Sequence, residues 1–293
     1  MKFDVAVIGG GPAGLSACIF TTRAGLNTIC FEKLAIGGQA SLSHDIGNYP
    51  GFNSISGFEL TMKMFEQAKV NGTQFIFGSV AKIKKLKTGF SIKTKTETYL
   101  TKKLIVACGT IPRRLGLNED KFIGKGVSYC ASCDGNFFKG KQVAIVGGGD
   151  SAFVYAEYLS RIVKKVFILN RSEKFKAGLK RIENVKKLKN VEILTNTQIK
   201  ELKGDDVLDG VMLNNGKELD VKGVFVAIGH VPDLKFLDFD LKKDKNGYIV
   251  VDKNMKTSEE NVFACGDIVS KHFRQVITAC ADGAIAGNSC IGE

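Results

Sequence analysis

The chain has little of what several common kinds of site are built from. Its 293 residues include no tryptophan, three histidines and four prolines. The histidines, His44, His230 and His272, show no ligand spacing, and most cysteines stand singly, so the sequence predicts no metal site. No apolar run approaches the length that spans a bilayer, and residues 1–4 lead directly into an apolar strand, which predicts neither a membrane segment nor a signal peptide.

The charge balance is strongly basic but shows no nucleic-acid pattern. Lysine and arginine number 42 against 30 acidic residues, which gives a formal net charge of +12. The lysines are spread along polar stretches such as 82–87 and 186–189, and no basic run is interleaved with aromatic residues. Nucleic acid is therefore not expected as a partner. The excess fits a solvated surface, or the steering of an acidic protein or of phosphate-bearing cofactors.

What is abundant indicates an α/β protein. Glycine reaches 33 residues, and 44% of the chain is hydrophobic. That combination suits many tight turns between buried strands and helices, and the length allows two domains with separate cores. One close cysteine pair among otherwise scattered cysteines, with no secretion signal, predicts a cytoplasmic protein.

A glycine-rich loop follows the first predicted strand. Residues 3–8 read as a buried parallel strand, and a helix is predicted over residues 12–24. Three glycines between them follow the pattern G-x-G-x-x-G: Gly9, Gly11 and Gly14. They allow a tight turn, the close approach of a pyrophosphate, and packing of helix on strand. A second strand, residues 28–31, ends at Glu32, whose carboxylate can accept hydrogen bonds from ribose hydroxyls.

The same order of elements recurs later in the chain. After a strand at residues 142–146, the loop returns as G-x-G-x-x-A, with Gly147, Gly149 and Ala152. Gly147 follows Gly9 by 138 positions, and the same offset takes Glu32 to Asn170, which is neutral and is followed by Arg171. An acidic residue would repel a ribose 2′-phosphate, whereas an arginine can bind it. The first loop therefore suits FAD, whose ribose hydroxyls are free, and the second suits NADP(H).

The segment between the loops carries a cysteine pair. Cys130 and Cys133 stand three positions apart, on one helical turn, and can close a small disulfide that is easily reduced. Asp134 follows directly and can move a proton to or from a departing sulfur. Half of a zinc site and an inert buried pair are the alternatives, and zinc would need further ligands. The favoured interpretation is that electrons from the nucleotide sites enter this disulfide.

The predicted fold class is α/β, with two Rossmann-like, three-layer ββα nucleotide-binding domains. Two predicted boundaries indicate that the second domain is inserted in the first. Residues 1–110 and 241–293 are expected to form the FAD-binding domain, because the short tail must return to complete the first sheet. Residues 111–240 are expected to form the NADP(H)-binding domain that carries the cysteine pair. Further predicted elements are helices at 57–70 and 276–288, a hairpin within 75–100, and strands at 104–109, 165–169, 224–229 and 261–267.

These motifs, in this order, resemble the low-molecular-weight thioredoxin reductases over essentially the whole chain. Besides the two loops and the cysteine pair, the likeness rests on short motifs: Gly37-Gly38-Gln39, Asn48-Tyr49-Pro50-Gly51, residues 227–230, Gly266-Asp267 and Arg274-Gln275. The resemblance implies a homodimeric FAD enzyme in which NADPH reduces the flavin and the flavin reduces the Cys130–Cys133 disulfide. The pair then reduces thioredoxin, a small acidic redox protein.

The resemblance also implies roles for individual residues. Cys133 would lie next to the isoalloxazine ring, Cys130 would attack the partner, and Asp134 would act as general acid and base. The residues implied for FAD are Gly9, Gly11, Pro12, Ala13, Gly14, Glu32, Gly38, Gln39, Asn48, Val80, Asp267, Arg274, Gln275 and Val276. Those implied for NADP(H) are Gly147, Gly149, Asp150, Ser151, Arg171, Lys176 and Gly229.

The chain departs from the family pattern at the clamp for the 2′-phosphate. The family has His-Arg-Arg, three residues, then Arg; here Asn170-Arg171-Ser172 is followed by Lys176. Lysine cannot form the bidentate fork of arginine. A charged hydrogen bond is worth about 1.5–3 kcal/mol, so the preference for NADPH falls by about an order of magnitude or more. NADPH stays the expected donor because two cations remain and no carboxylate replaces them. Cys108 and Cys265 stand where the family has Thr and Ala, and both are expected to be small buried fillers.

Other functions of the same fold remain as alternatives. A reductase that takes electrons from NADH, ferredoxin or reduced flavin would explain the weakened clamp, but the intact loop from Gly147 to Ala152 argues against it. A ferredoxin- or flavodoxin-NADP reductase would lack the pair Cys130 and Cys133. A non-catalytic flavin-binding protein would have no use for the complete cysteine motif with Asp134.

Overall fold

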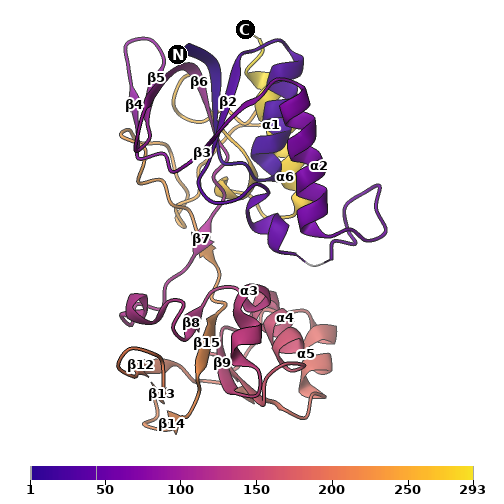
Figure 1. Cartoon of the computed structure of the whole chain (residues 1–293), viewed down its shortest axis with the longest axis vertical. Helices are drawn as coiled ribbons and strands as arrows, with labels where there is room; N and C mark the ends of the chain where they lie inside the picture. The colour runs from indigo at the N-terminus through magenta and orange to yellow at the C-terminus, as the bar shows by residue number, and fades with distance from the viewer. Residues whose placement is uncertain (1, 44, 293) are drawn as a thin grey trace. The chain divides into compact units, whose positions relative to one another are not determined.

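The computed structural model of the protein describes residues 2–43 and 45–292, so His44 lies outside the described residues. The chain divides into two compact α/β units. One consists of Met1–Ile111 and Val231–Glu293, and the other of Pro112–His230, so the second is inserted in the first (Figure 1). Two short strands, β7 (Ile111–Pro112) and β16 (His230–Val231), pair as a ribbon at the boundary.

The first unit contains a sheet whose central strands are parallel. Its strand order is β3-β2-β1-β6-β5-β4, and β17 also pairs with β6. Strands β1, β2, β3, β6 and β17 run parallel, whereas β4 and β5 form antiparallel pairs. The elements are β1 (Lys2–Ile8), α1 (Pro12–Arg23), β2 (Thr28–Glu32), η1 (Gly38–Leu42), α2 (Gly57–Val70), β3 (Gln74–Phe77), β4 (Lys82–Lys85), β5 (Phe90–Lys93), β6 (Thr98–Val106), β17 (Val262–Ala264), η4 (Gly266–Ile268) and α6 (Val276–Ser289).

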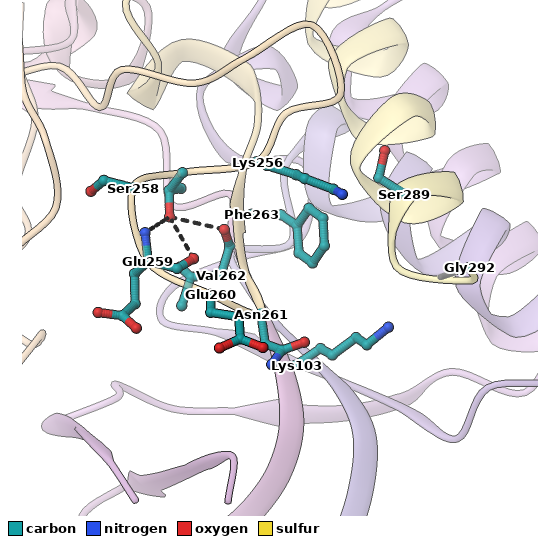
Figure 2. A pocket seen from close by; sticks show the side chains of 11 residues that line it. Lys103, Lys256, Ser258, Glu259, Glu260, Asn261, Val262, Phe263, Ser289 and Gly292 are labelled. Carbon is teal, nitrogen blue, oxygen red and sulfur yellow. Dashed lines mark hydrogen bonds between the residues drawn. The ribbon is translucent and has the colours of Figure 1, made fainter. Parts of the chain in front are cut away.

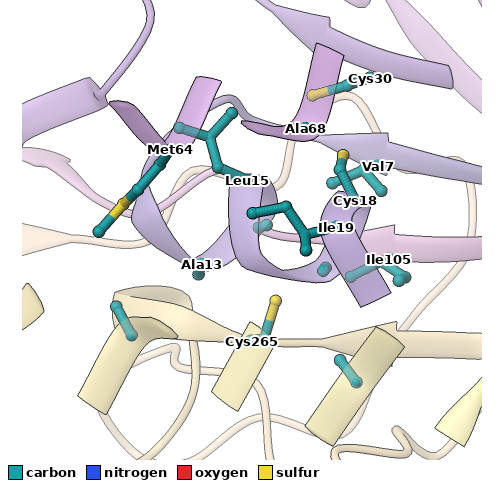
Figure 3. Close-up of a cluster of buried hydrophobic side chains, with 14 of the residues drawn as sticks. Val7, Ala13, Leu15, Cys18, Ile19, Cys30, Met64, Ala68, Ile105 and Cys265 are labelled. Atoms are coloured by element: carbon teal, nitrogen blue, oxygen red, sulfur yellow. The ribbon is translucent and has the colours of Figure 1, made fainter. Parts of the chain in front are cut away.

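Helices α1, α2 and α6 lie together beside this sheet (Figure 1). Val5 and Val7 of β1 face the helices and are fully buried, while Ala6 faces the second core on the other side of the sheet. Burial on both faces is the usual setting of a parallel strand and explains its continuous apolar run. Figure 3 shows the helix-side core, where Leu15 and Cys18 of α1 lie near Val7 and Ile105.

Glycines set how closely α6 approaches α1. A Cβ atom on Gly283 would lie 2.0 Å from the carbonyl oxygen of Ala13, and one on Gly287 would lie 2.8 Å from that of Ala17. Any larger residue at Gly283 would therefore force the helices apart. The close packing holds the middle of α6 against the start of α1, where the first glycine loop ends.

One predicted domain boundary is displaced. The sequence placed residues 231–240 in the inserted domain, whereas the structure places them in the first unit. The amide of Ile83 donates to the carbonyl of Phe236 at 2.6 Å, and the amide of Asp238 donates back to that of Ile83 at 2.9 Å. Leu234, Phe236 and Leu237 pack on the second core of that unit, which Ala6 faces. The polar, lysine-rich composition concealed these apolar anchors, which pair with a strand far away in the sequence.

The inserted unit has three layers. A parallel sheet of order β11-β10-β9-β15-β8 lies between helices on one side and the antiparallel strands β12-β13-β14 on the other. Phe153 and Phe225 fill the helix-side core, and Val211 and Val224 fill the core between the sheets. The elements are η2 (Glu119–Phe122), β8 (Val127–Ser128), α3 (Ala131–Asp134), η3 (Gly135–Phe138), β9 (Gln142–Val146), α4 (Asp150–Leu159), β10 (Lys165–Leu169), α5 (Leu179–Lys186), β11 (Val191–Leu194), β12 (Ile199–Lys203), β13 (Gly210–Leu213), β14 (Glu218–Leu219) and β15 (Gly223–Val226).

The internal repeat that the sequence predicts is present in the backbone. The amide of Gly9 donates to the carbonyl of Phe31 at 2.8 Å, and the amide of Gly147 donates to that of Leu169 at 3.0 Å. The offset of 138 positions relates both pairs. The two-domain Rossmann-like fold is thus confirmed.

Candidate functional site

The first glycine loop has the geometry of an anion cradle. Gly9 has a φ of +111°, and a Cβ atom on it would lie 2.4 Å from the carbonyl oxygen of Ala107. A Cβ atom on Gly14 would lie 1.8 Å from the oxygen of Gly9. Helix α1 begins at Pro12, and no side chain caps its N-terminus at Gly11. The free N–H groups of this 12-residue helix are therefore available to a diphosphate.

Glu32 lies at the end of β2 beside this loop, as expected. Its Oε2 accepts a hydrogen bond from the amide of Gly10 at 2.7 Å, and its Oε1 accepts one from the amide of Leu34 at 2.8 Å. The side chain is 9% exposed. Each carboxylate oxygen has a second lone pair, so Glu32 can hold the loop and still accept from a ribose hydroxyl.

A second glycine turn faces the first. The amide of Gly37 donates to the carbonyl of Gly10 at 2.8 Å, and a Cβ atom on Gly38 would lie 3.5 Å from the Cα of Gly11. A side chain at Gly38 would therefore touch the backbone of the first loop at Gly11.

The C-terminal segment brings Asp267 and its neighbours to the same edge of the unit. A Cβ atom on Gly266 would lie 2.7 Å from the Cβ of Ala13, so η4 contacts the first turn of α1. The Arg274 guanidinium lies 4.1 Å from the ring centre of Tyr248, and its Nε donates to the Asp267 carbonyl at 3.4 Å. Val276 begins helix α6.

The remaining predicted FAD residues occupy loops of the same unit. Asn48 donates from Nδ2 to Oε1 of Gln275 at 3.0 Å, which joins two predicted site residues that are far apart in sequence. Gln39 donates from Nε2 to the carbonyl of Thr110 at 2.7 Å. Val80 lies between β3 and β4 and is half-buried against the core.

A buried ion pair that the sequence analysis missed lies behind Asp267. Lys271 Nζ lies 2.7 Å from Oδ2 of Asp282 and 3.8 Å from Oδ1 of Asp267. Asp282 also accepts from the amide of Gly266 at 3.2 Å. Only 16% of the Lys271 side chain and 14% of the Asp282 side chain are exposed. The spacing of eleven residues follows no local pattern, so only the folded chain reveals the pair.

The second glycine loop is tied to the segment that carries the predicted phosphate clamp. A Cβ atom on Gly148 would lie 2.4 Å from Oδ1 of Asn170, so Asn170 stands beside the loop as Glu32 does in the first unit. Nδ2 of Asn170 donates to the carbonyls of Ser172 and Lys174, at 2.7 and 3.1 Å. The amide of Lys176 donates to the carbonyl of Gly148 at 2.8 Å. Residues 170–176 are therefore fixed against the loop.

The two predicted cations of the clamp are exposed on this segment. Within residues 2–43 and 45–292, the side chains of Arg171 and Lys176 form no hydrogen bond or ion pair. Asp150, at the start of α4, accepts a hydrogen bond from the amide of Gly178 at 3.1 Å. It therefore helps to fix the chain just after Lys176. Ser151 is exposed in the first turn of the same helix, and Gly229 follows β15 with a φ of +92°.

The cysteine pair forms a disulfide at the start of α3. The Cα atoms of Cys130 and Cys133 are 5.3 Å apart, and Cys130 is the N-cap residue. The amide of Cys133 donates to Sγ of Cys130 at 3.2 Å. Asp134 accepts a hydrogen bond at Oδ2 from the Ser128 hydroxyl at 2.7 Å. Cys133 is the more exposed of the two, so exposure alone does not identify the attacking sulfur.

Two dinucleotide loops and one redox-type disulfide in a single chain narrow the choice of family. A profile described as pyridine nucleotide-disulphide oxidoreductase matches residues 3–283. The thioredoxin reductase of Treponema pallidum (strain Nichols) is 40% identical over 294 residues, which cover 98% of this chain and 95% of that protein. The chain belongs to the thioredoxin reductases.

Solved structures agree with this family. The crystal structure of Lactococcus lactis thioredoxin reductase in the FR conformation matches with a TM-score of 0.91 and 35% identity, and the match covers 99% of this chain and 98% of that one. The T. acidophilum thioredoxin reductase matches with a TM-score of 0.88 and 37% identity over the same shares. A thioredoxin reductase is an oxidoreductase, and its family uses flavin and pyridine nucleotide.

An exposed aromatic residue lies close to the disulfide of this thioredoxin reductase family member. Phe137 is 75% exposed, whereas the adjacent Phe138 is buried and contacts Phe225 edge-on at 5.3 Å between ring centres. The sequence analysis did not single out Phe137. Two consecutive aromatic residues after a short helix cannot both face one core, and that signal could have identified it.

The surroundings of three further cysteines, Cys30, Cys108 and Cys265, disfavour the thiolate form. A hydrogen bond with Cys18, together with burial, raises the pKa of the Cys30 thiol well above its ordinary value. Burial raises the pKa of Cys108 to about 12 and also raises that of Cys265. Figure 3 shows Cys18, Cys30 and Cys265 in the core. Thiols that stay protonated are poor nucleophiles. Cys265 is buried, as expected of a filler, whereas Cys108 is only partly buried.

A pocket of about 290 Å³ in the first unit lies away from the glycine loop. Its lining mixes Lys103 and Lys256 with Glu259 and Glu260 (Figure 2). Glu259 and Glu260 precede β17, and Lys103 precedes the part of β6 that pairs with β17, so the pocket lies at the amino end of β17. Dinucleotides bind at the carboxyl ends, so this pocket is not the cofactor site.

Within residues 2–43 and 45–292, no group of three or more His, Cys, Asp or Glu side chains could hold a metal ion. None of the helices in the described part of the chain combines the length and the apolar character that a bilayer crossing requires.

Proposed function

We propose that the protein is a thioredoxin-disulfide reductase that passes electrons from NADPH through FAD to the Cys130–Cys133 disulfide and on to thioredoxin. The observation that carries the proposal is this disulfide, at the start of α3, in a chain with two separate dinucleotide loops. The names of its relatives support thioredoxin as the partner.

FAD is assigned to the first unit. The facing turns at Gly11 and Gly38, the open N-terminus of α1 and the carboxylate of Glu32 provide for a diphosphate and a ribose. Asp267 and the start of α6 at Val276 lie at the same edge, where the rest of the cofactor would be held. When bound there, FAD supplies two-electron transfer between a nicotinamide and a disulfide.

NADPH is assigned to the second unit. Arg171 and Lys176 are cationic, exposed and fixed beside the glycine loop, and no carboxylate takes the place of Asn170. One charged hydrogen bond to a 2′-phosphate is worth about 1.5–3 kcal/mol, so even a single such contact from these two exposed cations should let NADPH exceed NADH in kcat/KM by about tenfold or more.

Thioredoxin reduction follows from thiol–disulfide exchange. In the reduced pair, the Cys130 thiolate attacks the thioredoxin disulfide, and the leaving thioredoxin sulfur takes a proton from Asp134. The Cys133 thiolate then attacks Cys130, which re-forms the internal disulfide and releases the second thioredoxin sulfur. The amide of Cys133, 3.2 Å from Sγ of Cys130 in the disulfide, is a donor that would stabilise a thiolate there.

The proposal also includes an acidic protein partner, a homodimer and a cytoplasmic location. The exposed Phe137 beside the pair gives an apolar contact for a docked protein, and the net charge of +12 favours an acidic one such as thioredoxin. A homodimer and a cytoplasmic location are proposed from the resemblance to the family. Free buried thiols such as Cys18 and Cys30 suit a reducing compartment.

Anaerobic titration of the purified protein tests the proposal. NADPH should bleach the flavin absorbance, NADH should do so less efficiently, and oxidised thioredoxin should restore the colour. A protein that binds no flavin, or whose flavin neither nucleotide reduces, would contradict the assignment. A clear preference for NADH, or reduction only by ferredoxin or free reduced flavin, would reject NADPH as the donor and leave the disulfide chemistry in place.

A further inference from the structure

The side chain of Ser128 is buried between the cysteine pair and Asp134. Ser128 ends strand β8, which pairs with β15 at Phe225, and only 4% of the residue is exposed. Its Oγ lies 2.7 Å from Oδ2 of Asp134, 3.0 Å from the amide nitrogen of Cys130 and 3.2 Å from the Cys130 carbonyl. A buried hydroxyl needs partners within the protein, and these atoms provide them.

Ser128 has one hydroxyl hydrogen, and the distances to its two possible acceptors show which of them receives it. Asp134 and the Cys130 carbonyl both compete for it, but the carboxylate is closer by half an ångström and is the stronger acceptor when ionised. The hydroxyl therefore donates to Asp134 and accepts from the Cys130 amide. One side chain thus ties the carboxylate to the backbone at the first cysteine.

Asp134 depends on this contact for its position. Among the described residues, Ser128 is the only hydrogen-bond partner of the Asp134 side chain. Helix α3 has four residues and ends at Asp134, so the helix gives the carboxylate little support. The next residue is closely packed, since a Cβ atom on Gly135 would lie 2.9 Å from Leu159 and 3.0 Å from Tyr158. The packing around Gly135 therefore fixes the backbone after Asp134, and the hydrogen bond from Ser128 fixes the Asp134 carboxylate.

We propose that Ser128 is a positioning residue for proton transfer at the disulfide, an inference that rests on the proposed function. Its hydroxyl holds the Asp134 carboxyl group where it can protonate the leaving sulfur. Asp134 first takes the proton of the Cys130 thiol, and the resulting thiolate attacks one partner sulfur. As the new bond to Cys130 Sγ forms and the partner disulfide breaks, Asp134 passes that proton to the released sulfur. Asp134 then takes the proton of the Cys133 thiol, the Cys133 thiolate closes the internal disulfide on Cys130, and the second partner sulfur leaves and takes that proton. The partner gains two electrons and two protons, and the cysteine pair loses the same number.

A single-turnover experiment isolates this step from the electron donor. The protein is reduced with dithiothreitol, the excess is removed, and the rate of reduction of a disulfide is followed. Two substrates are compared: oxidised thioredoxin, whose leaving group is an aliphatic thiolate, and 5,5′-dithiobis(2-nitrobenzoate), whose aromatic thiolate leaves readily without a proton. General acid catalysis contributes about 10²–10⁴-fold, and loss of positioning should remove part of this.

Ser128→Ala is expected to slow thioredoxin reduction about tenfold while the aromatic disulfide reacts within about twofold of the wild-type rate. Ser128→Gly, which removes the whole side chain, should show the same selective slowing of thioredoxin reduction. Ser128→Thr should restore the rate. Ser160→Ala is the matched control, because its hydroxyl donates to the Glu157 carbonyl at 3.0 Å in the same unit and should leave both rates unchanged.

A double-mutant cycle supplies the second readout. If Ser128 acts through Asp134, then Ser128→Ala adds no further loss in an Asp134→Asn protein. Equal slowing of both disulfides, slowing of neither, or additive effects in the double variant would overturn the inference. A wild-type protein that reduces the aromatic disulfide but not thioredoxin would refute the proposed partner instead. The comparison then uses bis(2-hydroxyethyl) disulfide, which also releases an aliphatic thiolate.

Discussion

Replacing Lys271 with methionine removes the cation that joins two acidic groups behind the proposed flavin site. Lys271 Nζ lies 2.7 Å from Asp282 and 3.8 Å from Asp267, and both partners of the closer pair are about 85% buried. Removing one member of a buried pair costs about 3–5 kcal/mol, because the other charge stays unpaired in a poorly solvated site. The residual exposure and the Gly266 amide offset part of this cost. We therefore expect a loss near the lower limit, about 3 kcal/mol.

Thermal unfolding of the purified protein measures this loss. For a unit of this size, about 3 kcal/mol corresponds to a fall in Tm of about 6–12 °C. The bound flavin should also dissociate more readily, because Asp267 loses its cationic neighbour. The double variant Lys271→Met/Asp282→Asn should recover most of the loss, since the more buried acid then carries no charge and its amide oxygen can still accept from Gly266. Asp267 keeps its charge, but its side chain is 39% exposed and remains partly solvated.

The same substitution at an exposed pair is the control. Lys63 lies 3.5 Å from Glu59 on α2, and both side chains are more than half exposed. Lys63→Met should therefore change the free energy of unfolding by no more than about 0.5 kcal/mol. A loss of stability in Lys271→Met as small as in this control, or a double variant less stable than the single one, would contradict the buried ion pair's expected contribution.

Three further predictions follow from the sites. Cys133→Ser should trap a mixed disulfide between Cys130 and thioredoxin that dithiothreitol releases, and Cys130→Ser should trap none; the reverse pattern on non-reducing gels would exchange the two roles. Asn170→Glu should lower the ratio of kcat/KM for NADPH to that for NADH by about tenfold or more, since a carboxylate repels a 2′-phosphate, and an unchanged ratio would contradict the site. Burial alone would raise the pKa of Glu119, but hydrogen bonds from backbone amides, including those of Leu117 and Leu115, hold it below its ordinary value. Its contribution to stability is therefore present above the unfolded pKa, about 4.3, and is lost as pH falls through the folded one. Glu119→Gln should then lower Tm at pH 7, with the difference from wild type disappearing in acid; a difference that persists below pH 3 would have another cause.

Local patterns predicted what depends on neighbours in sequence. The strand before Gly9, the turn itself and the helix after it are encoded within about twenty residues, and the fold places them as expected. The second loop at Gly147 followed from the first by the same offset. The disulfide followed from the spacing of Cys130 and Cys133 alone.

Contacts between distant segments were not predictable in the same way. Residues 231–240 belong to the first unit because Phe236 pairs with Ile83, about 150 positions earlier, and no local feature indicates that pairing. Ser128 and Lys271 are common residues in unremarkable contexts, and their roles depend on Asp134 and Asp282 after folding. Sequence patterns identify elements and turns, whereas the partners of buried polar groups are known only once the chain has folded.

The positions of Glu32 and Asn170 show how one backbone design could serve two cofactors. Both side chains lie against the second glycine of their loops, but their hydrogen bonds run in opposite directions. Glu32 accepts from the amides of Gly10 and Leu34. The side-chain amide of Asn170 instead donates to the carbonyls of Ser172 and Lys174. A glutamate at position 170 would face those two carbonyls without a hydrogen to donate. Asn170→Glu should therefore also loosen the segment that carries the cations, so NADPH efficiency falls without an equal gain for NADH. A full change of cofactor would require the segment after Asn170 to turn amides, rather than carbonyls, toward the carboxylate.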